Sequence, residues 1–223
     1  MPLAISPYHK PGFYDQALAN GRHRDIVGGR WDDTGRAEMR VLQNAGLRPE
    51  HHLLDIGAGC LRLGCKAVPY LAPGHYWATD KSGALMLKGR EVELADPALL
   101  PEDHLIEDDQ FAFPGVPATI THAIAFAVFT HLPLDYLGLG LGQIQRSFPA
   151  LQCLLFTVFL APDANAHPLP HRQPDGAVTH PCRAPYHHLE TQVLALCNRE
   201  GFRASPKSDL LPRGQVLFTA TRA

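Results

Sequence analysis

Residues 53–64 read Leu-Leu-Asp-Ile-Gly-Ala-Gly-Cys-Leu-Arg-Leu-Gly, and residues 76–80 read Tyr-Trp-Ala-Thr-Asp. Each segment contains a short apolar run that reaches an acidic residue, and the sequence between them suits a helix over residues 60–71. This order predicts the first β-α-β unit of an open parallel sheet. Because Gly57 and Gly59 lack a Cβ, the backbone can turn sharply there and a ligand can lie against it. The helix is expected to point its first N–H groups at that ligand.

The kind of ligand follows from three side chains around this turn. Asp80 ends the second strand, where its carboxylate can accept hydrogen bonds from the two hydroxyls of a ribose. Arg62 stands where the dinucleotide pattern G-x-G-x-x-G has its third glycine, which disfavours a nicotinamide dinucleotide. Asp55 places a carboxylate beneath the turn, where it would repel a pyrophosphate and attract a cation. S-adenosylmethionine (SAM) carries an ammonium and a sulfonium group and therefore fits better.

The same residues carry a resemblance to a known family. Residues 53–64 together with Asp80 resemble the glycine-rich and ribose-binding motifs of class I SAM-dependent methyltransferases. Residues 125–133, Ala-Phe-Ala-Val-Phe-Thr-His-Leu-Pro, resemble the strand-four motif of that family, with Thr121 in place of an acid common near the start of that strand. Where relatives commonly carry a polar residue, Phe126 would offer the sulfonium a cation–π contact. A turn that uses glycine for geometry alone, without a ligand, is the alternative.

The composition restricts the class of protein. A chain of 223 residues suits one domain, or one domain with a small cap. The net charge of −2 and the pI near 6.7 argue against a nucleic-acid partner. The longest apolar runs are shorter than the roughly 18 residues of a membrane span, and no export signal is visible. Five cysteines without a C-x-x-C pair indicate reduced thiols. We expect a cytoplasmic protein with a small-molecule partner, and the oligomeric state stays open.

Residues 1–34 precede the sheet, and we interpret them as a cap or lid over the ligand, with residues 35–223 as the SAM-binding domain. Their aromatic density exceeds that of a disordered tail. We expect a short helix over residues 11–20 and a turn at residues 27–31 that delivers Trp31 toward the site. Tyr14 and Trp31 are therefore predicted to contact the substrate. Alternatively, the aromatic rings only cover an apolar surface.

Hydrophobic spacing predicts the remaining elements. These are helices over residues 35–47, 82–94, 134–148 and 186–201, and strands over residues 104–107, 120–129, 154–161, 202–207 and 215–221. Ser82 is expected to cap the second of these helices. Three glycines, at positions 138, 140 and 142, lie inside the third helix, which is therefore expected to be short, closely packed or mobile.

The loop after the third strand is the expected adenine site. The carboxylate of Asp109 or the amide of Gln110 can accept a hydrogen bond from the exocyclic amine, and Phe111 can pack on the ring. An acidic loop facing water is the alternative. The predicted cofactor-binding residues are Asp55, Gly57, Ala58, Gly59, Arg62, Asp80, Lys81, Asp109, Gln110, Ala125 and Phe126.

Histidines in two segments of the second half of the chain are candidate functional residues. His131, at the mouth of the sheet, is a candidate general base, and the alternative is a histidine that fixes its loop by hydrogen bonds. The proline-rich loop over residues 162–185 and the residues just after it contain five histidines and Cys182. Their spacing matches no standard zinc pattern, so we expect no metal, although a metal site in this region stays an open alternative.

The C-terminal part extends the resemblance. Residues 185–187, Pro-Tyr-His, and residues 212–215, Pro-Arg-Gly-Gln, resemble elements of a small bacterial methyltransferase subgroup that also carries a V-G-G-x-W element near its start. This resemblance makes Tyr186 a second candidate catalytic residue, in addition to His131. It also adds His187 and Gln215 to the candidate substrate contacts, which already include Tyr14 and Trp31. Each of these residues could instead only cap or pack its element.

The resemblance implies a Rossmann-like, seven-stranded, mostly parallel sheet with helices on both faces, an antiparallel last strand and a small N-terminal cap. It implies methyl transfer from SAM to a small molecule held between the cap, the loop around residue 130 and the 162–187 loop. Alternatives are transfer or cyclisation of the aminocarboxypropyl group of SAM, which would release methylthioadenosine, and a nucleotide-binding module without activity. A nicotinamide-dependent oxidoreductase is the remaining alternative.

Overall fold

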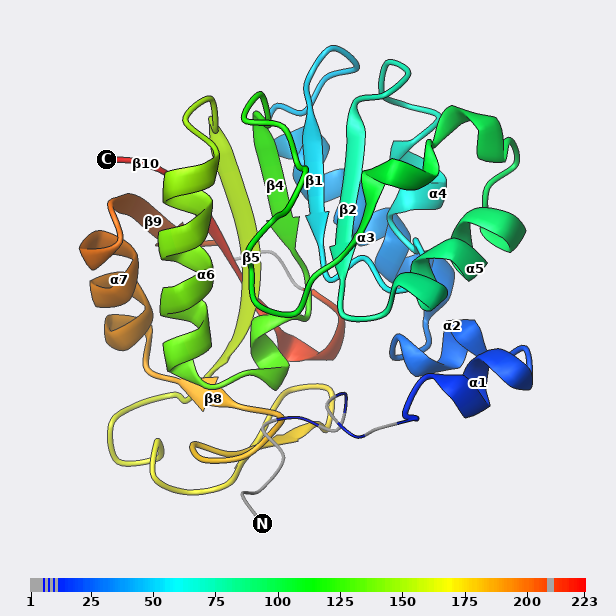
Figure 1. The fold of residues 1–223 in the computed structure, drawn as a ribbon. Helices are drawn as coiled ribbons and strands as arrows, with labels where there is room; N and C mark the ends of the chain where they lie inside the picture. Colours follow the sequence, from blue (N-terminus) through cyan, green and yellow to red (C-terminus); the bar gives the residue numbers. More distant parts are fainter. Residues whose placement is uncertain (1–5, 7, 9, 11, 208–210) are drawn as a thin grey trace. The chain divides into compact units, whose positions relative to one another are not determined.

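The structure, a computed structural model, describes residues 6, 8, 10, 12–207 and 211–223. The main sheet has the strand order β3-β2-β1-β4-β5-β10-β9, and β8 pairs with β5 beside this path (Figure 1). This order confirms the predicted Rossmann-like α/β fold class. The strands are β1 (Leu53–Ile56), β2 (Tyr76–Asp80), β3 (Leu105–Glu107), β4 (His122–Ala125), β5 (Cys153–Leu160), β8 (His187–His188), β9 (Phe202–Pro206) and β10 (Val216–Arg222).

The described residues divide into two compact units, which we describe separately. Unit 2 consists of residues 12–124 and 147–151, and unit 1 contains the other described residues. The predicted boundary between a cap and a SAM-binding domain at residue 34 is a different division, and residues 1–5, 7, 9 and 11 of that cap lie outside the described residues.

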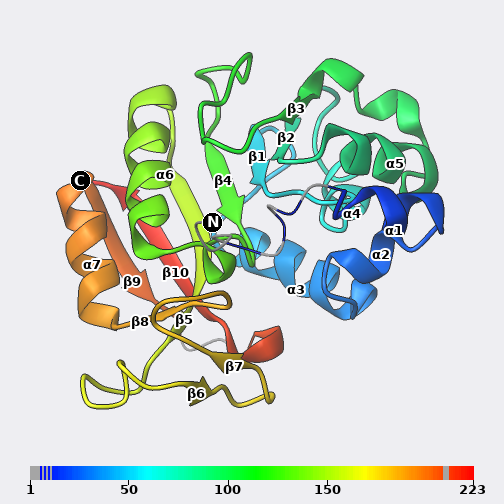
Figure 2. The same ribbon diagram turned by 60° about the horizontal axis from the view of Figure 1, so that its bottom comes forward.

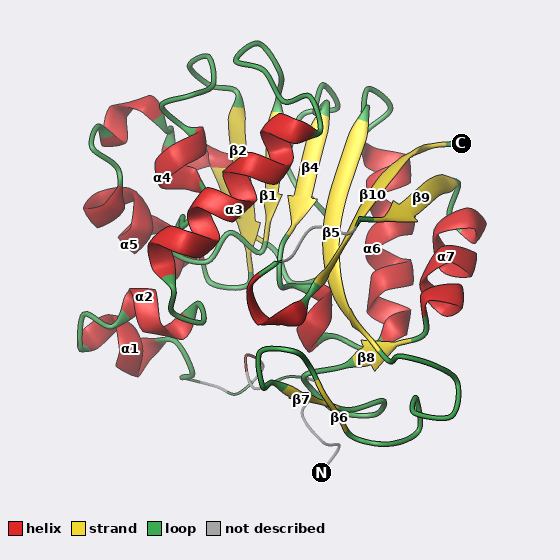
Figure 3. Ribbon diagram, turned by 180° about the vertical axis from the view of Figure 1, so that it is seen from behind, coloured by secondary structure: helices red, strands yellow, loops and turns green. Residues whose placement is uncertain are grey.

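Unit 2 contains the β-α-β unit predicted for residues 53–80. β1 pairs in parallel with β2 and β4, and β2 pairs in parallel with β3. All four residues of β1 are buried, as expected for a strand covered on both faces. The helices of this unit are α1 (Asp15–Ala19), α2 (His23–Ile26), α3 (Trp31–Asn44), α4 (Gly64–Ala67) and α5 (Gly83–Glu93). Figure 3 shows α1 and α2 near the end of the sheet toward which the β1 and β2 arrows point.

Two helices of unit 2 differ from their predicted bounds. The helix expected over residues 60–71 is reduced to α4, because Leu61 adopts a left-handed φ of 63° that interrupts a helix. The helix expected over residues 35–47 begins earlier, at Trp31, where two aspartates in the first turn suit the helix dipole. Ser82 caps α5 as predicted, since its Oγ accepts the N–H of Leu85 at 3.2 Å.

Unit 1 contains the antiparallel part of the sheet. β10 runs antiparallel to both β5 and β9, which confirms the predicted antiparallel last strand. The helices are α6 (Leu134–Ser147, of which residues 134–146 belong to this unit) and α7 (Glu190–Arg199). The glycines of α6 serve close packing: a Cβ on Gly138 would lie 3.0 Å from Nη2 of Arg199, and one on Gly142 would lie 2.8 Å from Oε2 of Glu200.

The segment between β5 and α7 is a structured loop. A short hairpin, β6 (His171–Arg172) with β7 (Val178–Thr179), lies beside the 3-10 turn at Pro212–Gly214 (Figure 2), and a Cβ on Gly214 would lie 2.7 Å from Pro174. The prediction of a helix from Tyr186 is wrong at its start, because residues 187–188 pair with β5 and the helix begins at Glu190.

Gly89 of α5 gives a direct test of how closely α5 packs against the backbone at Cys60. A Cβ at this position would lie 2.2 Å from the backbone oxygen of Cys60 and 2.4 Å from its carbonyl carbon, and backbone cannot move aside cheaply. Gly89→Ala is therefore expected to destabilise the protein by about 1–3 kcal/mol, although alanine favours helices. Chemical denaturation measures this change.

Gly138→Ala in α6 is the control for that substitution. The three atoms nearest to the new methyl group belong to the side-chain ends of Arg199 and Leu196, at 3.0 Å or more, and these ends can shift. We expect a change within about 0.5 kcal/mol, the range of tolerated substitutions. Equal losses in the two variants would contradict the assignment of Gly89 as a backbone-contact position.

Candidate functional site

The turn after β1 is bound to the end of β2 through its own backbone. The N–H groups of Gly57 (2.7 Å) and Ala58 (3.0 Å) both donate to the carbonyl oxygen of Thr79. The N–H of Gly59 donates to Oδ2 of Asp80 at 2.9 Å. Both glycines have positive φ, 72° and 57°, a conformation that favours glycine. The helix predicted from residue 60 begins at Gly64, and the N–H groups of the turn itself are bound within the protein.

Asp80 holds this turn with both of its carboxylate oxygens. Oδ1 accepts the N–H of Ser82 at 2.9 Å, and Oδ2 accepts the N–H of Gly59. Burial raises the pKa of Asp80, and these two backbone N–H groups oppose that rise. Because each carboxylate oxygen can accept two hydrogen bonds, the group keeps acceptor capacity for a ligand hydroxyl.

A second buried carboxylate, Asp55, lies in β1 directly before the turn. The hydroxyl of Tyr76 donates to its Oδ2 at 2.7 Å. Burial, together with the negative charge of Glu38, raises the pKa of Asp55 to about 7. At neutral pH this carboxyl group is therefore divided between its neutral and charged forms.

Arg62 is used inside the protein. Its Nη2 lies 2.6 Å from Oε1 of Glu38, and its Nη1 donates to the carbonyl oxygen of Val27 at 2.9 Å. Burial raises the pKa of Glu38, and Arg62 opposes that rise. The guanidinium connects the turn to α3 and to the N-terminal segment, and its contact with the cofactor stays a prediction.

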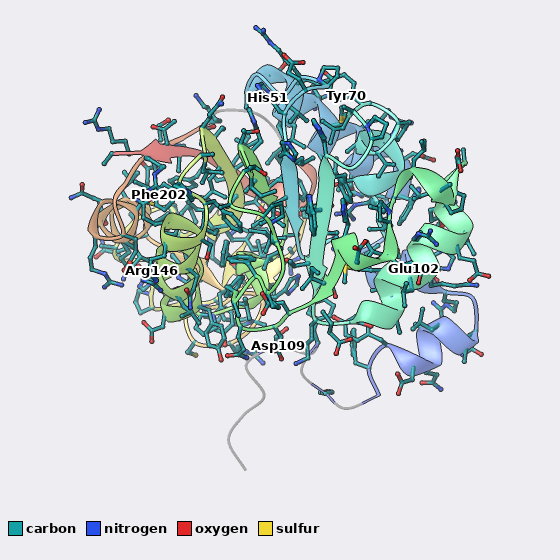
Figure 4. All side chains as sticks on the ribbon, turned by 45° about the horizontal axis from the view of Figure 1, so that its top comes forward. His51, Tyr70, Glu102, Asp109, Arg146 and Phe202 are labelled. Carbon is teal, nitrogen blue, oxygen red and sulfur yellow. The ribbon has the colours of Figure 1, made fainter. Side chains whose placement is uncertain are left out.

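The loops after β2 and β3 bring together three predicted cofactor residues. Nζ of Lys81 lies 3.0 Å from Oδ2 of Asp109, and Nε2 of Gln110 donates to Oδ1 of Asp109 at 2.9 Å. Figure 4 shows Asp109 and His51 at opposite ends of unit 2, which places Asp109 at the end where these strands finish. Its neighbour Asp108 shapes the loop by accepting two backbone N–H groups.

In unit 1, the segment after β4 is held by buried polar contacts. Ala125, the last residue of β4, and Phe126 are both buried. Ala127 has a φ of 60°, and its N–H donates to Oγ1 of Thr157 at 2.8 Å. The hydroxyl of Thr157 in turn donates to Oε1 of Gln215 at 2.6 Å. Gln215, a predicted substrate contact, thus orders the loop in which Phe126 lies.

His131 follows this loop and is partly buried. Its ring meets that of Tyr8 edge-on, with centroids 4.9 Å apart. Burial, with a smaller effect of Arg213, lowers the pKa of His131 to about 4. A neutral imidazole with so low a pKa is a weak base, which favours an orienting role over proton abstraction. The N–H of Tyr186 donates to the carbonyl oxygen of Thr130 at 2.8 Å, so the two candidate catalytic residues belong to neighbouring segments.

The two adjacent histidines of β8 differ in their surroundings. His187 is fully buried, its Nδ1 lies 2.8 Å from Oγ1 of Thr179, and its Nε2 lies 2.9 Å from the carbonyl oxygen of His167. Both ring nitrogens of this predicted substrate contact are therefore used within the loop. His188 is also buried, yet its Nε2 has no hydrogen-bond partner, and burial lowers its pKa to about 4. Sequence spacing could not tell the two apart.

The aromatic residues predicted to face the substrate have neighbours within unit 2. The guanidinium of Arg24 lies over the ring of Trp31, 5.0 Å from its centroid. The ring of Tyr14 meets that of Phe13 edge-on at 5.3 Å. A hollow of about 530 Å³ between α1 and α2 is lined by Phe13 and six neighbouring residues, and it contains neither predicted substrate contact.

Clustered metal ligands and long apolar helices are both absent among the described residues. No group of three or more histidine, cysteine, aspartate or glutamate side chains among them is arranged to hold a metal ion. In the same part of the chain, no helix combines the length and the apolar character that crossing a membrane requires.

The sequence did not predict the contacts that residues from distant parts of the chain make with the site. Glu38 and Tyr76 belong to α3 and β2 and become neighbours of Arg62 and Asp55 only through the fold. Gly89 touches the backbone of Cys60 from α5. The only available signal was a glycine in the middle of a predicted helix, which often marks a close contact.

Solved structures share this fold across the whole chain. Magnesium protoporphyrin IX methyltransferase from Synechocystis PCC 6803 with bound SAM aligns with a TM-score of 0.60 at 15% identity, over 97% of this chain and 94% of its own. A TehB-like SAM-dependent methyltransferase from Corynebacterium glutamicum gives 0.61 at 16% identity, over 96% and 100% of the two chains. A putative O-methyltransferase from Nostoc punctiforme PCC 73102 gives 0.69 at 12% identity, over 100% and 64%. No family model and no curated protein matches the sequence.

The chain therefore has the fold of SAM-dependent methyltransferases of class I, as the sequence motifs predicted. These structures are 12–16% identical to the chain, and what they share with it is the fold.

The raised pKa of Asp55 can be tested through the pH dependence of protein stability. A carboxyl group whose pKa is higher in the folded than in the unfolded state binds more protons when folded, so its contribution to stability falls as the pH rises from about 4 to above 7. An amide at this position would stay neutral and still accept the Tyr76 hydroxyl. Asp55→Asn is therefore expected to stabilise the ligand-free protein by roughly 2–3 kcal/mol more at pH 8 than at pH 5.

Denaturation between pH 5 and pH 8 measures this difference, with the exposed Asp33→Asn on α3 as the control. An Asp55→Asn variant that is less stable than the wild type at pH 8 would contradict the buried, partly neutral state of Asp55.

Proposed function

We propose that the protein is a SAM-dependent methyltransferase that acts on a small-molecule acceptor. The observation that carries this proposal is the turn at Gly57–Gly59, held by Asp80 and underlain by buried carboxyl groups. A site of this kind offers acceptors to a ribose and a negative field to a cation. A structural neighbour supports the choice, since the Synechocystis magnesium protoporphyrin IX methyltransferase was solved both with bound SAM and with bound S-adenosylhomocysteine.

The side chains around the turn fit this cofactor. Asp80 keeps acceptor capacity for the ribose hydroxyls after binding Gly59 and Ser82. The carboxylates of Asp55 and Glu38 are accompanied by the guanidinium of Arg62, so a cation near the turn meets an excess of acidic groups. A pyrophosphate would be repelled by the same groups. Lys81, Asp109 and Gln110 are proposed to line the adenine side.

The bound cofactor would supply a methyl group activated by its sulfonium. The residues of this chain then have to hold the acceptor in line and keep water away. Within unit 1, Ala125 and Phe126 stay the residues predicted for the methionine part of the cofactor, and Gln215 fixes their loop through Thr157. His131 and Tyr186 orient the acceptor, and His188, with a buried unpartnered nitrogen, is a further acceptor contact.

Ligand binding and turnover test the proposal together. SAM is expected to raise the melting temperature of the protein, by an amount that corresponds to about 2.7 kcal/mol at a hundred times its Kd, and NAD is expected to have no effect. Asp80→Asn should weaken SAM binding roughly tenfold to a hundredfold, since it removes a charged acceptor from the ribose. Asp163→Asn, which also removes a carboxylate that accepts two backbone N–H groups, should leave SAM affinity unchanged.

Product analysis separates the remaining alternatives. Methyl transfer from SAM to acceptors in a metabolite extract yields S-adenosylhomocysteine, whereas use of the aminocarboxypropyl group yields methylthioadenosine. Stabilisation by NAD without stabilisation by SAM would overturn the proposal. Binding of SAM without either product would leave a nucleotide-binding module.

A further inference from the structure

A segment of unit 2, residues 22–31, lies against the glycine turn, and we call it the strap. The thiol of Cys60 donates to the carbonyl oxygen of His23 at 3.1 Å, and Nη1 of Arg62 donates to that of Val27 at 2.9 Å. The side chain of Val27 rests on Gly59, where an added Cβ would lie 2.6 Å from Cγ1 of Val27. Two side chains of the turn region therefore hold the strap by its backbone, and Val27 covers the glycine.

A buried carboxylate at the end of α5 holds the strap from the other side. Oε1 of Glu93 lies 2.6 Å from Nε2 of His23 and 2.7 Å from Nε of Arg24, and Oε2 lies 2.6 Å from Nη2 of Arg24. The Glu93 side chain is only 4% exposed. Arg24 is further fixed by its position over the ring of Trp31. A bidentate, charge-assisted contact of this kind is strong and directional.

The contacts of α5 connect the strap to the turn. Gly89 and Glu93 are four residues apart, so they lie on one face of the helix. Gly89 touches the backbone of Cys60, Cys60 binds the carbonyl of His23, and His23 reaches Glu93. This closed ring of contacts contains one unsatisfied atom, because Nδ1 of His23 is buried without a partner.

We propose that Glu93 is a positioning residue that latches the strap over the glycine turn and thereby sets how fast the cofactor is released. The inference rests on the proposed function, because it concerns the same cofactor site. Glu93 itself acts only through His23 and Arg24. Loss of its charge leaves the guanidinium of Arg24 without a buried carboxylate, so the strap opens more often while the turn and Asp80 stay in place.

The experiment compares Glu93→Gln with Glu91→Gln. Glu91 lies two residues earlier on α5, where its exposed carboxylate pairs with Lys88. Hydrogen exchange of residues 22–31 without ligand reports the strap, and stopped-flow measurements with SAM report association and release. For Glu93→Gln we expect on the order of tenfold faster exchange and tenfold faster SAM release, with association not slowed. Glu91→Gln should match the wild type in all three, and Glu93→Asp, which keeps the charge, should restore part of the protection.

The outcomes separate the two hypotheses. If the wild type binds no SAM, the proposed function fails, and the exchange data still show whether Glu93 holds the strap. If the wild type binds SAM but Glu93→Gln and Glu91→Gln release it at the same rate, the latch is refuted and the proposed function stands. Should Glu93→Gln fold poorly, Arg24→Gln, whose side chain is 54% exposed, is the second variant and must change exchange and release in the same direction.

Discussion

The hydrogen bonds between the Asp80 carboxylate and the N–H groups of Gly59 and Ser82 are the interaction on which the proposed site depends. They join the turn after β1 to the start of α5 at the end of β2. A charged acceptor between two backbone donors fixes the turn more firmly than water would, and it lets glycine keep a conformation that other residues avoid. The geometry of the cofactor site therefore follows from one side chain on the neighbouring strand.

Charge beneath the turn gives this geometry its chemical preference. Asp55 and Glu38 are buried with one guanidinium close to them, and burial raises the pKa of both carboxyl groups. Buried acids of this kind are unfavourable for the empty protein and favourable once a cation lies nearby. The strap over residues 22–31 adds a second layer, because Val27 covers Gly59 while Glu93 and Arg62 hold its backbone and side chains.

The sequence predicted those parts of the molecule whose structure is determined by residues close together in the chain. The β1 turn, the Ser82 cap and the order of the sheet follow from local patterns, and the structure has them. Local patterns failed at residues 60–71, where the left-handed φ of Leu61 interrupts the predicted helix. They also failed at residues 187–188, where pairing with β5 replaces a helix. The roles of Arg62, His187 and Glu93 depend on partners about 20 to 70 residues away, and no spacing rule contains that information.

The most direct measurement of the central claim is the number of protons released when SAM binds. Titration calorimetry at pH 7 in two buffers of different ionisation enthalpy gives this number. Because the pKa of Asp55 is about 7, a cation bound over the turn should expel roughly half a proton at pH 7 and almost none at pH 8.5. Absence of binding heat, or binding without proton release at pH 7, would contradict the claim that a buried carboxyl group selects a cationic nucleoside.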